Sequence, residues 1–308
     1  MADVYLCLLL SIAVSLALRC QAIDNSEDFA AGKLVGHVIF KDLDDASGLA
    51  ASRKFKNVLY THSDGGGGPY IYAINETSGS LIATFRIANA KNHDWEDIAV
   101  GPCGNSTCIY IADSGQNYHS KSSANTIYRV LEPDFIIRSM DQDLPLDSIA
   151  QYTWSEEQSE TLMVDPKGEV YLIGYVCSGR GMVSHLPKSA WGSPNPVNID
   201  SSQFLPINTD HHDPVSGDIS MDGSKLLIKS KYHIFYWRIE GSDVLGSLTT
   251  TPVEVPYHYE GNGDSQAVCW SADGQNYYTL PEGHNPPLYI YTRNNTRSPD
   301  IVGNLIGK

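Results

Sequence analysis

The sequence has few positive charges, and this shortage limits the partners that the protein could bind. Lys and Arg together number 21, against 36 Asp and Glu, so the formal net charge at pH 7 is −15. A surface of this sign repels nucleic acid and anionic lipid. It favours cations, cationic partners or mineral calcium, although solubility alone is the simpler explanation of the charge. We therefore expect no nucleic-acid partner.

Several familiar catalytic and metal-binding motifs are also missing. The sequence has no Gly-x-Ser-x-Gly elbow, no His-Glu-x-x-His helix and no Cys-x-x-Cys pair. These absences remove the commonest signatures of serine hydrolases, metalloproteases and structural zinc sites. They do not exclude a hydrolase that recruits its catalytic groups from scattered loops. Since no complete catalytic set is visible, the sequence favours a protein that is not an enzyme.

Amphipathic helical patterns are absent as well, and short strand-like runs take their place. These runs are rich in Val, Ile, Tyr and Thr and are bounded by Gly, Asn, Asp and Pro. They recur about every 50 residues, which is typical of β-propeller blades. The clearest copies contain Ser47-Gly48-Leu49-Ala50 before Val58-Leu59-Tyr60-Thr61, and Glu96-Asp97-Ile98-Ala99 before Ile109-Tyr110-Ile111-Ala112.

The repeats predict an all-β fold with a single propeller domain over residues 23–308. We expect five blades, over residues 47–87, 95–154, 160–199, 216–255 and from 265 onward. The stretch 130–159 is long enough to hide a sixth. The segment Leu34–Phe40 precedes the first blade and lacks a partner there. We expect it to add an outer strand to the last blade and so close the ring.

The first 22 residues are expected to be a secretory signal peptide rather than part of the fold. Residues 4–18 are almost wholly apolar, and Cys20-Gln21-Ala22 offers small residues at the usual cleavage spacing. A membrane anchor is the alternative, but the run is short for a span, and no later stretch is apolar enough to cross a bilayer. Three sequons, at Asn75, Asn105 and Asn294, agree with a secreted glycoprotein.

Removal of that segment leaves four cysteines. Cys103 and Cys108 flank a four-residue turn and could form a local disulfide across a hairpin. Cys177 and Cys269 fall in blades that would not be neighbours. Each could equally be a buried free thiol or half of a bridge.

In a propeller, polar residues from separate blades meet at one mouth of the central channel. The residues that precede inner strands or follow second strands should lie there. They include carboxylates or amides at Asp64, Glu96, Asp113, Asn117, Glu160 and Asp218, together with Asp94, Asp97, Gln266 and Glu282. Oxygen-only ligands suit calcium or magnesium. The alternative is that these side chains bind water and cap turns. His62 and His284 are the candidate catalytic bases.

The string Asp94-Trp95-Glu96-Asp97-Ile98-Ala99, followed by Ile109-Tyr110-Ile111-Ala112-Asp113, resembles a family of secreted, propeller-like proteins found in bacteria and several eukaryotes. The resemblance covers most of the chain after the leader and brings no established activity. This sequence departs from the family pattern by having Gln116 in place of an acid, and Gln266 near another acidic position. More remotely, the architecture is similar to calcium-dependent lactonase and esterase propellers.

These observations lead to one main hypothesis and two alternatives. The main hypothesis is a secreted acidic glycoprotein that uses a rigid propeller to bind an extracellular ligand, a matrix component or a cation. The first alternative is a calcium-dependent hydrolase with its site in the central channel, where Glu96, Asp113, Asn117 and Glu160 would hold the ion. The second is an acidic component of an extracellular or biomineral matrix.

Overall fold

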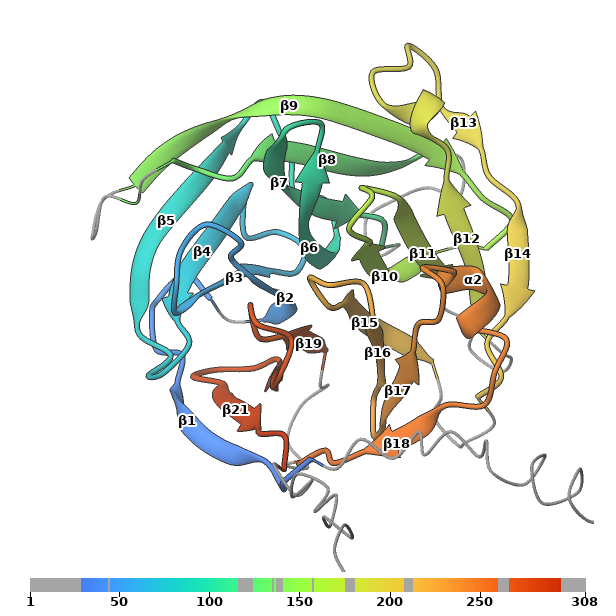
Figure 1. Ribbon diagram of the computed structural model, residues 1–308. Helices are drawn as coiled ribbons and strands as arrows, with labels where there is room; N and C mark the ends of the chain where they lie inside the picture. The colour runs from blue at the N-terminus through green and yellow to red at the C-terminus, as the bar shows by residue number, and fades with distance from the viewer. Residues whose placement is uncertain are drawn as a thin grey trace, which may run out of the picture.

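The protein is almost entirely built from β-strands. The computed structural model describes residues 29–43, 45–115, 124–134, 136, 141–156, 158–174, 181–207, 213–259 and 266–294 (Figure 1). Within them, the helical segments are the short turns η1 (Lys188–Ala190) and α2 (Val244–Ser247). The all-β prediction is therefore confirmed. No helix among the described residues has the length and apolar character needed to cross a membrane.

The strands form antiparallel groups of four. The first group is β2 (Ala46–Ala51), β3 (Val58–Ser63), β4 (Tyr70–Asn75) and β5 (Leu81–Ala88). The second is β6 (Trp95–Cys103), β7 (Ser106–Asp113), β8 (Asn125–Leu131) and β9 (Asp141–Thr153). Parallel pairing of β5 with the start of β9 joins these two groups into one sheet, and β13 (Val197–Asn198), which pairs with β9, is its ninth strand. The described residues of the 130–159 stretch thus lie mainly in β9.

Two further groups follow in chain order. One contains β10 (Ser159–Val164), β11 (Val170–Gly174), β12 (Met182–Leu186) and β14 (Ser201–Phe204). The other contains β15 (Pro214–Ile219), β16 (Lys225–Ser230), β17 (Ile234–Arg238) and β18 (Val253–Val255).

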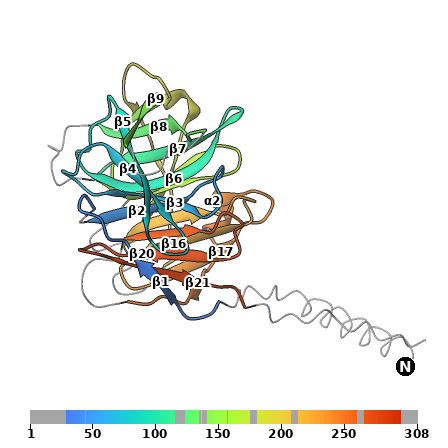
Figure 2. The same cartoon turned by 90° about the vertical axis from the view of Figure 1, so that its left-hand side faces the viewer.

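The last group combines the two ends of the described chain. Strands β19 (Ala267–Trp270), β20 (Tyr277–Leu280) and β21 (Pro287–Tyr291) are followed in the sheet by β1 (Lys33–His37), which pairs antiparallel with β21. Figure 1 shows β2, β6, β10, β15 and β19 around the middle of the molecule, with β5, β9, β14, β18 and β1 at its periphery. Turned by 90°, β9 and β1 again lie toward opposite edges (Figure 2).

The hydrophobic core lies between neighbouring groups of strands. Aromatic side chains such as Tyr60, Phe85 and Trp95 are completely buried there, in one cluster with Ile98 and Ile111. The innermost strands use small residues instead, as in Ala46–Ala51, because these strands converge on the axis and leave little room. Burial of this apolar surface is the main force that holds the groups together.

Four inner strands carry the same irregularity near their N-terminal ends. The pairing register shifts between Ala46 and Gly48, Trp95 and Asp97, Ser159 and Thr161, and Pro214 and Ser216. In each case one residue is left without a partner in the ladder, which is a β-bulge. The bulged residues are Ser47, Glu96, Glu160 and Val215. A bulge changes the direction of its side chain, so the side chains at these four positions do not follow the alternation between the two faces of the sheet that the rest of the strand shows.

The disulfide predicted between Cys103 and Cys108 is present across the β6–β7 hairpin. Cys269 is a buried free thiol in β19, and burial raises its pKa well above the usual value. Cys177 lies outside the described residues.

Because the disulfide closes so short a loop, its loss should be tolerated. Loop-closure entropy for a few residues is worth about 2 kcal/mol. We expect the double variant Cys103→Ser/Cys108→Ser to fold and to lose about that much stability, measured by denaturant unfolding. A double variant that fails to fold would show that the hairpin depends on the bond for its formation.

Candidate functional site

Three carboxylates meet where the first and second groups of strands adjoin. Asp64 directly follows β3, Asp94 directly precedes β6, and Glu96 is the bulged residue of β6. One oxygen from each of these side chains lies within 4.8 Å of the others. Asp94 is completely buried and Glu96 nearly so, while Asp64 is partly buried. We call these three residues the acidic cluster.

Other acids from distant parts of the chain surround the acidic cluster. Glu160, the bulged residue of β10, raises the pKa of Glu96, and so does Glu282 from the segment after β20. Asp213, just before β15, adds to the same effect on Glu160. Side chains from all five groups of strands therefore converge at the N-terminal ends of the inner strands. The sequence had placed all of them there except Asp213.

This crowding strongly disfavours ionisation of the acidic side chains. Burial raises the pKa of Glu160 to about 8, with further contributions from Asp64 and Glu282. Burial also raises the pKa of Asp64 to about 6, helped by the adjacent charge of Asp94. The pKa of Glu96 is raised well above its ordinary value, first by burial and then by Glu160. Like charges held this close either share protons or bind a cation.

The loop that carries Asp94 is fixed by its own hydrogen bonds. The side chain of Asn92 donates to the carbonyl oxygens of Ser63 and Asp64, at 3.1 and 2.9 Å. The backbone N–H of Trp95 donates to the Asn92 side chain at 3.2 Å, and the Trp95 indole donates to the carbonyl of Lys91. The acidic cluster therefore sits on a preformed backbone.

Asp113, predicted as a metal ligand, has a different set of contacts. Its carboxylate accepts the backbone N–H groups of His93 and Asp94 at 3.2 and 2.9 Å, and its second oxygen lies 2.9 Å from Nδ1 of His93. Asp113 thus positions the loop and does not belong to the three-residue acidic cluster. Asn117 lies outside the described residues.

Asp218, the other predicted ligand, lies further along its inner strand. Its carboxylate accepts the backbone N–H of Trp270 at 2.8 Å, and the nearby charge of Arg53 acts on its pKa, which burial raises to about 6. Its place near the C-terminal end of β15 separates it from the acidic cluster. Asp218 is therefore not one of the three carboxylates of the acidic cluster.

The two candidate bases also differ in their surroundings. His62 in β3 has no exposed surface, and burial lowers its pKa to about 4. Its Nδ1 lies 3.0 Å from the carbonyl oxygen of Ser63, and its ring packs edge-on against Trp95. His284 is exposed, two residues beyond Glu282. Of the two histidines, His284 is the one with access to solvent.

Asp97, next to the acidic cluster in sequence, has a structural role that the sequence did not reveal. It is completely buried, and one of its oxygens accepts the backbone N–H groups of Leu162 and Gly217, at 2.9 and 3.4 Å. The other accepts the N–H of Ile98 and the hydroxyl of Ser216, at 2.9 and 3.2 Å. One carboxylate thereby links the inner strands β6, β10 and β15.

Gly115 lies directly against the acidic cluster. A Cβ at this position would lie 1.9 Å from Oε1 of Glu96 and 2.2 Å from Oδ2 of Asp94. We expect Gly115→Ala to displace both carboxylates and to cost about 1–3 kcal/mol of stability, measured by thermal unfolding. Gly67→Ala is the control, because its Cβ would meet the Cβ of Ser63 at 3.0 Å and would contact no carboxylate of the cluster. Equal effects of the two variants would contradict this account.

The three predicted glycosylation sites lie on or near turns. Asn105 is exposed in the β6–β7 hairpin, and Asn294 is exposed after β21. Asn75 ends β4 and is partly buried, with its side-chain oxygen accepting the N–H and hydroxyl of Thr77, at 2.8 and 2.7 Å. The exposure of Asn105 and Asn294 is compatible with modification.

Comparison with known proteins identifies the fold class. No family model matches the chain. No curated protein matches it either. The structure of the PQQ-bound form of aldose sugar dehydrogenase from Streptomyces coelicolor is 11% identical, with a TM-score of 0.53, and the match covers 88% of this chain and 100% of that one. A gluconolactonase from Xanthomonas campestris is 11% identical over 88% and 99% of the two chains, with a TM-score of 0.48.

A third similar structure, hydrazine synthase from Kuenenia stuttgartiensis, is 13% identical over 82% of this chain and 84% of that one, with a TM-score of 0.45. The match to the sugar dehydrogenase supports a β-propeller, and at this level of identity it concerns the fold alone.

Proposed function

We propose that the chain is a secreted, acidic glycoprotein whose five-bladed propeller binds a hard divalent cation, calcium by preference, at one mouth of its central channel. In this proposal β2, β6, β10, β15 and β19 are the inner strands of the five blades, and β1 closes the ring through its pairing with β21. The cation would stabilise a rigid platform for an extracellular ligand or matrix component. The observation that carries the proposal is the proximity of Asp64, Asp94 and Glu96, within 4.8 Å.

Calcium fits this acidic cluster for two reasons. Its preferred ligands are oxygens, and carboxylates are the ligands that this cluster offers. Glu160 and Glu282 are close enough to raise the pKa of Glu96, so their negative charge also favours a bound cation. A cation of charge +2 would relieve a repulsion that otherwise forces some of these groups to hold protons.

Calorimetric titration with calcium and thermal unfolding would test this proposal. We expect calcium to raise the melting temperature and a chelator to reverse the increase, because a ligand that binds only the folded state stabilises it. Glu96→Gln should weaken calcium binding at least tenfold. Asp143→Asn is the matched control, since Asp143 is an exposed acid that pairs with Arg86. No heat of binding and no change on chelation would overturn the proposal.

The second candidate is a calcium-dependent hydrolase of the lactonase or esterase kind. It is favoured by the exposed His284, which neighbours Glu282 beside the acidic cluster and could act as a base while the ion polarises a carbonyl. A panel of lactones and aryl esters would test it. Calcium-dependent turnover that Glu96→Gln abolishes would favour this candidate. Equal turnover by that variant would show that Glu96 is not part of the catalytic site.

Secretion and glycosylation are part of the proposal and have their own measurement. Expression in a eukaryotic secretory host should release a chain that begins after Ala22 and carries glycans on Asn75, Asn105 or Asn294, as read by mass spectrometry. Binding to calcium carbonate or to matrix polymers would distinguish the biomineral alternative, and indifference to these surfaces would contradict it.

A further inference from the structure

A small cavity opens at the other end of the inner strands, away from the acidic cluster. It has a volume of about 190 Å³ and is formed where β2, β6, β10 and β15 end. Its walls are mostly apolar, and its polar side chains are those of Arg53, Thr107, Asp165 and Ser220. The lining includes Arg53, Val100, Pro102, Val164, Pro166 and Ser220. We call it the Arg53 cavity.

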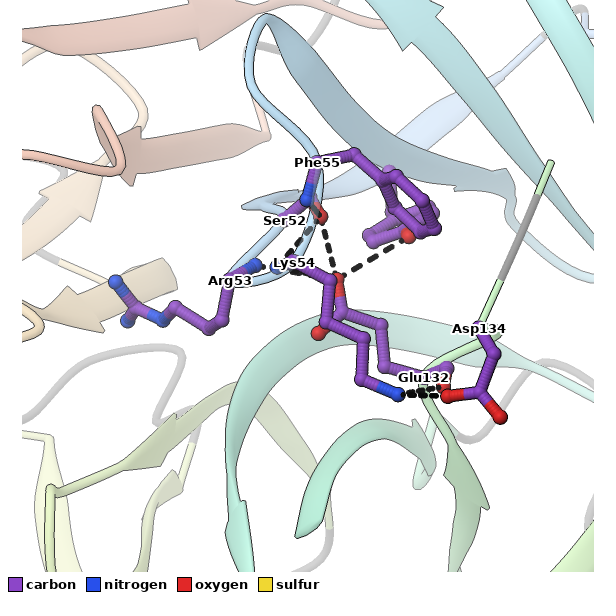
Figure 3. Close-up of polar contacts among 7 residues, drawn as sticks. Ser52, Arg53, Lys54, Phe55, Glu132 and Asp134 are labelled. Atoms are coloured by element: carbon purple, nitrogen blue, oxygen red, sulfur yellow. Dashed lines mark hydrogen bonds and ion pairs between the residues drawn. The ribbon is translucent and has the colours of Figure 1, made fainter.

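The backbone of Arg53 is held firmly from one side. Glu132, which is buried, accepts hydrogen bonds from the backbone N–H groups of Arg53 and Lys54, at 3.1 and 3.3 Å, and also from the hydroxyls of Ser52 and Tyr60. Lys54 in turn donates to Asp134 at 2.8 Å. Figure 3 shows this network, with the Arg53 side chain extending away from Glu132. Glu132 therefore holds the backbone of Arg53, while the guanidinium points away from this carboxylate and is not neutralised by it.

The guanidinium of Arg53 makes only some of the hydrogen bonds that it could donate. Its Nε donates to the carbonyl oxygen of Val100 at 3.3 Å, which fixes the plane of the group at the cavity wall. Its Nη1 is buried, yet it has no hydrogen-bond partner among the described residues. A buried donor without an acceptor is costly, and a ligand that supplies an acceptor oxygen recovers that cost.

The acids close to the Arg53 cavity do not satisfy this donor. Asp165, which lines the cavity, uses its Oδ1 within its own turn, where this oxygen accepts the N–H groups of Lys167 and Glu169, at 2.8 and 2.9 Å. The charge of Arg53 affects the pKa of Asp218, but the carboxylate of Asp218 accepts its hydrogen bond from the N–H of Trp270. Its negative charge repels any anion beside Arg53, and repels a doubly charged one more than a singly charged one. A singly charged group suits the site better.

We propose that the Arg53 cavity binds a small monocarboxylate with a short, branched apolar body. The carboxylate would accept hydrogen bonds from the guanidinium of Arg53, which lines the cavity, since guanidinium and carboxylate are matched in geometry and charge. The apolar body would contact Val100, Val164 and Pro166. This site is independent of the proposed cation site, because it lies at the opposite ends of the same inner strands.

A pair of probes of the same shape tests the charge requirement without any mutation. The probes are 3-methylbutanoate and its neutral amide, titrated by calorimetry at pH 7 in the presence of chelator, so that no cation site contributes. We expect the carboxylate to bind at least tenfold more tightly than the amide and to shift the methyl resonances of Val100 and Val164. Equal affinities, or shifts that leave both valines unaffected, would overturn the proposal.

Substitution of the arginine provides the second arm of the test. We expect Arg53→Gln to weaken 3-methylbutanoate binding at least tenfold, and Arg53→Lys to weaken it as well, because an ammonium lacks the fork geometry. Arg86→Gln, at an exposed arginine paired with Asp143, should leave binding unchanged. Unchanged binding by Arg53→Gln, or inorganic phosphate binding as tightly as the carboxylate, would contradict the assignment.

Discussion

Asp97→Ala should lower the free energy of unfolding by about 3–5 kcal/mol, because several buried donors lose their acceptor at once. The N–H groups of Leu162 and Gly217 and the hydroxyl of Ser216 all donate to this carboxylate. They belong to strands that do not hydrogen-bond to each other in a sheet. Denaturant unfolding would measure the loss.

Two comparisons make this prediction specific. Asp97→Asn keeps the shape and one acceptor oxygen, so it should lose less stability than the alanine variant. Asp143→Ala removes an exposed carboxylate and should change stability little. Similar unfolding midpoints for Asp97→Ala and Asp143→Ala would mean that the three strands are held together in some other way.

Without divalent cation, the buried acids should make the protein less stable as the pH rises from about 6.5 to about 8, above the range in which the lowered pKa of His62 acts in the opposite direction. The pKa of Glu160 is raised from 4.5 to about 8 in the folded protein. The folded state therefore keeps a proton that the unfolded chain releases, and stability falls as the pH rises through this window. Asp64, with its pKa raised to about 6, adds to the decline. Glu160→Gln should remove part of it and make the cation-free protein more stable at pH 8, by about 1–2 kcal/mol.

Thermal unfolding across this pH range, in chelator, would measure the effect. Glu240→Gln is the control, since Glu240 is exposed after β17. Saturating calcium should flatten the pH profile of the unsubstituted protein, because the cation replaces the shared protons. Parallel profiles for the unsubstituted protein and Glu160→Gln would contradict the prediction.

Much of the fold could be predicted from the sequence because the repeat is regular. Alternating small and apolar residues, as in Ser47-Gly48-Leu49-Ala50, mark inner strands, and their recurrence defines the groups. The segment after residue 33 could be assigned as an outer strand because it has no local partner, and β1 indeed pairs with β21. The long β9, which pairs with both β8 and β5, was not predictable, because no local pattern indicates a second partner.

The candidate site was harder to predict, since residues with the same local pattern have different roles. Glu96 and Asp97 are neighbours in sequence, yet a bulge places Glu96 in the acidic cluster, while Asp97 is buried among backbone donors. Asp113 looks like a ligand in the sequence but stabilises the loop before β6. Arg53 belongs to no recognisable sequence motif. Its significance comes from a cavity that four strands form together.

The four bulges have a consequence for how such a protein can change over evolutionary time. The same backbone irregularity presents Ser47, Glu96, Glu160 and Val215. Since none of these residues takes part in the regular ladder, replacing one alters the chemistry of the opening with little disturbance of the scaffold. The architecture thus provides several positions outside the regular ladder, through which descendants of one ancestor could acquire or lose ligand preferences by single substitutions.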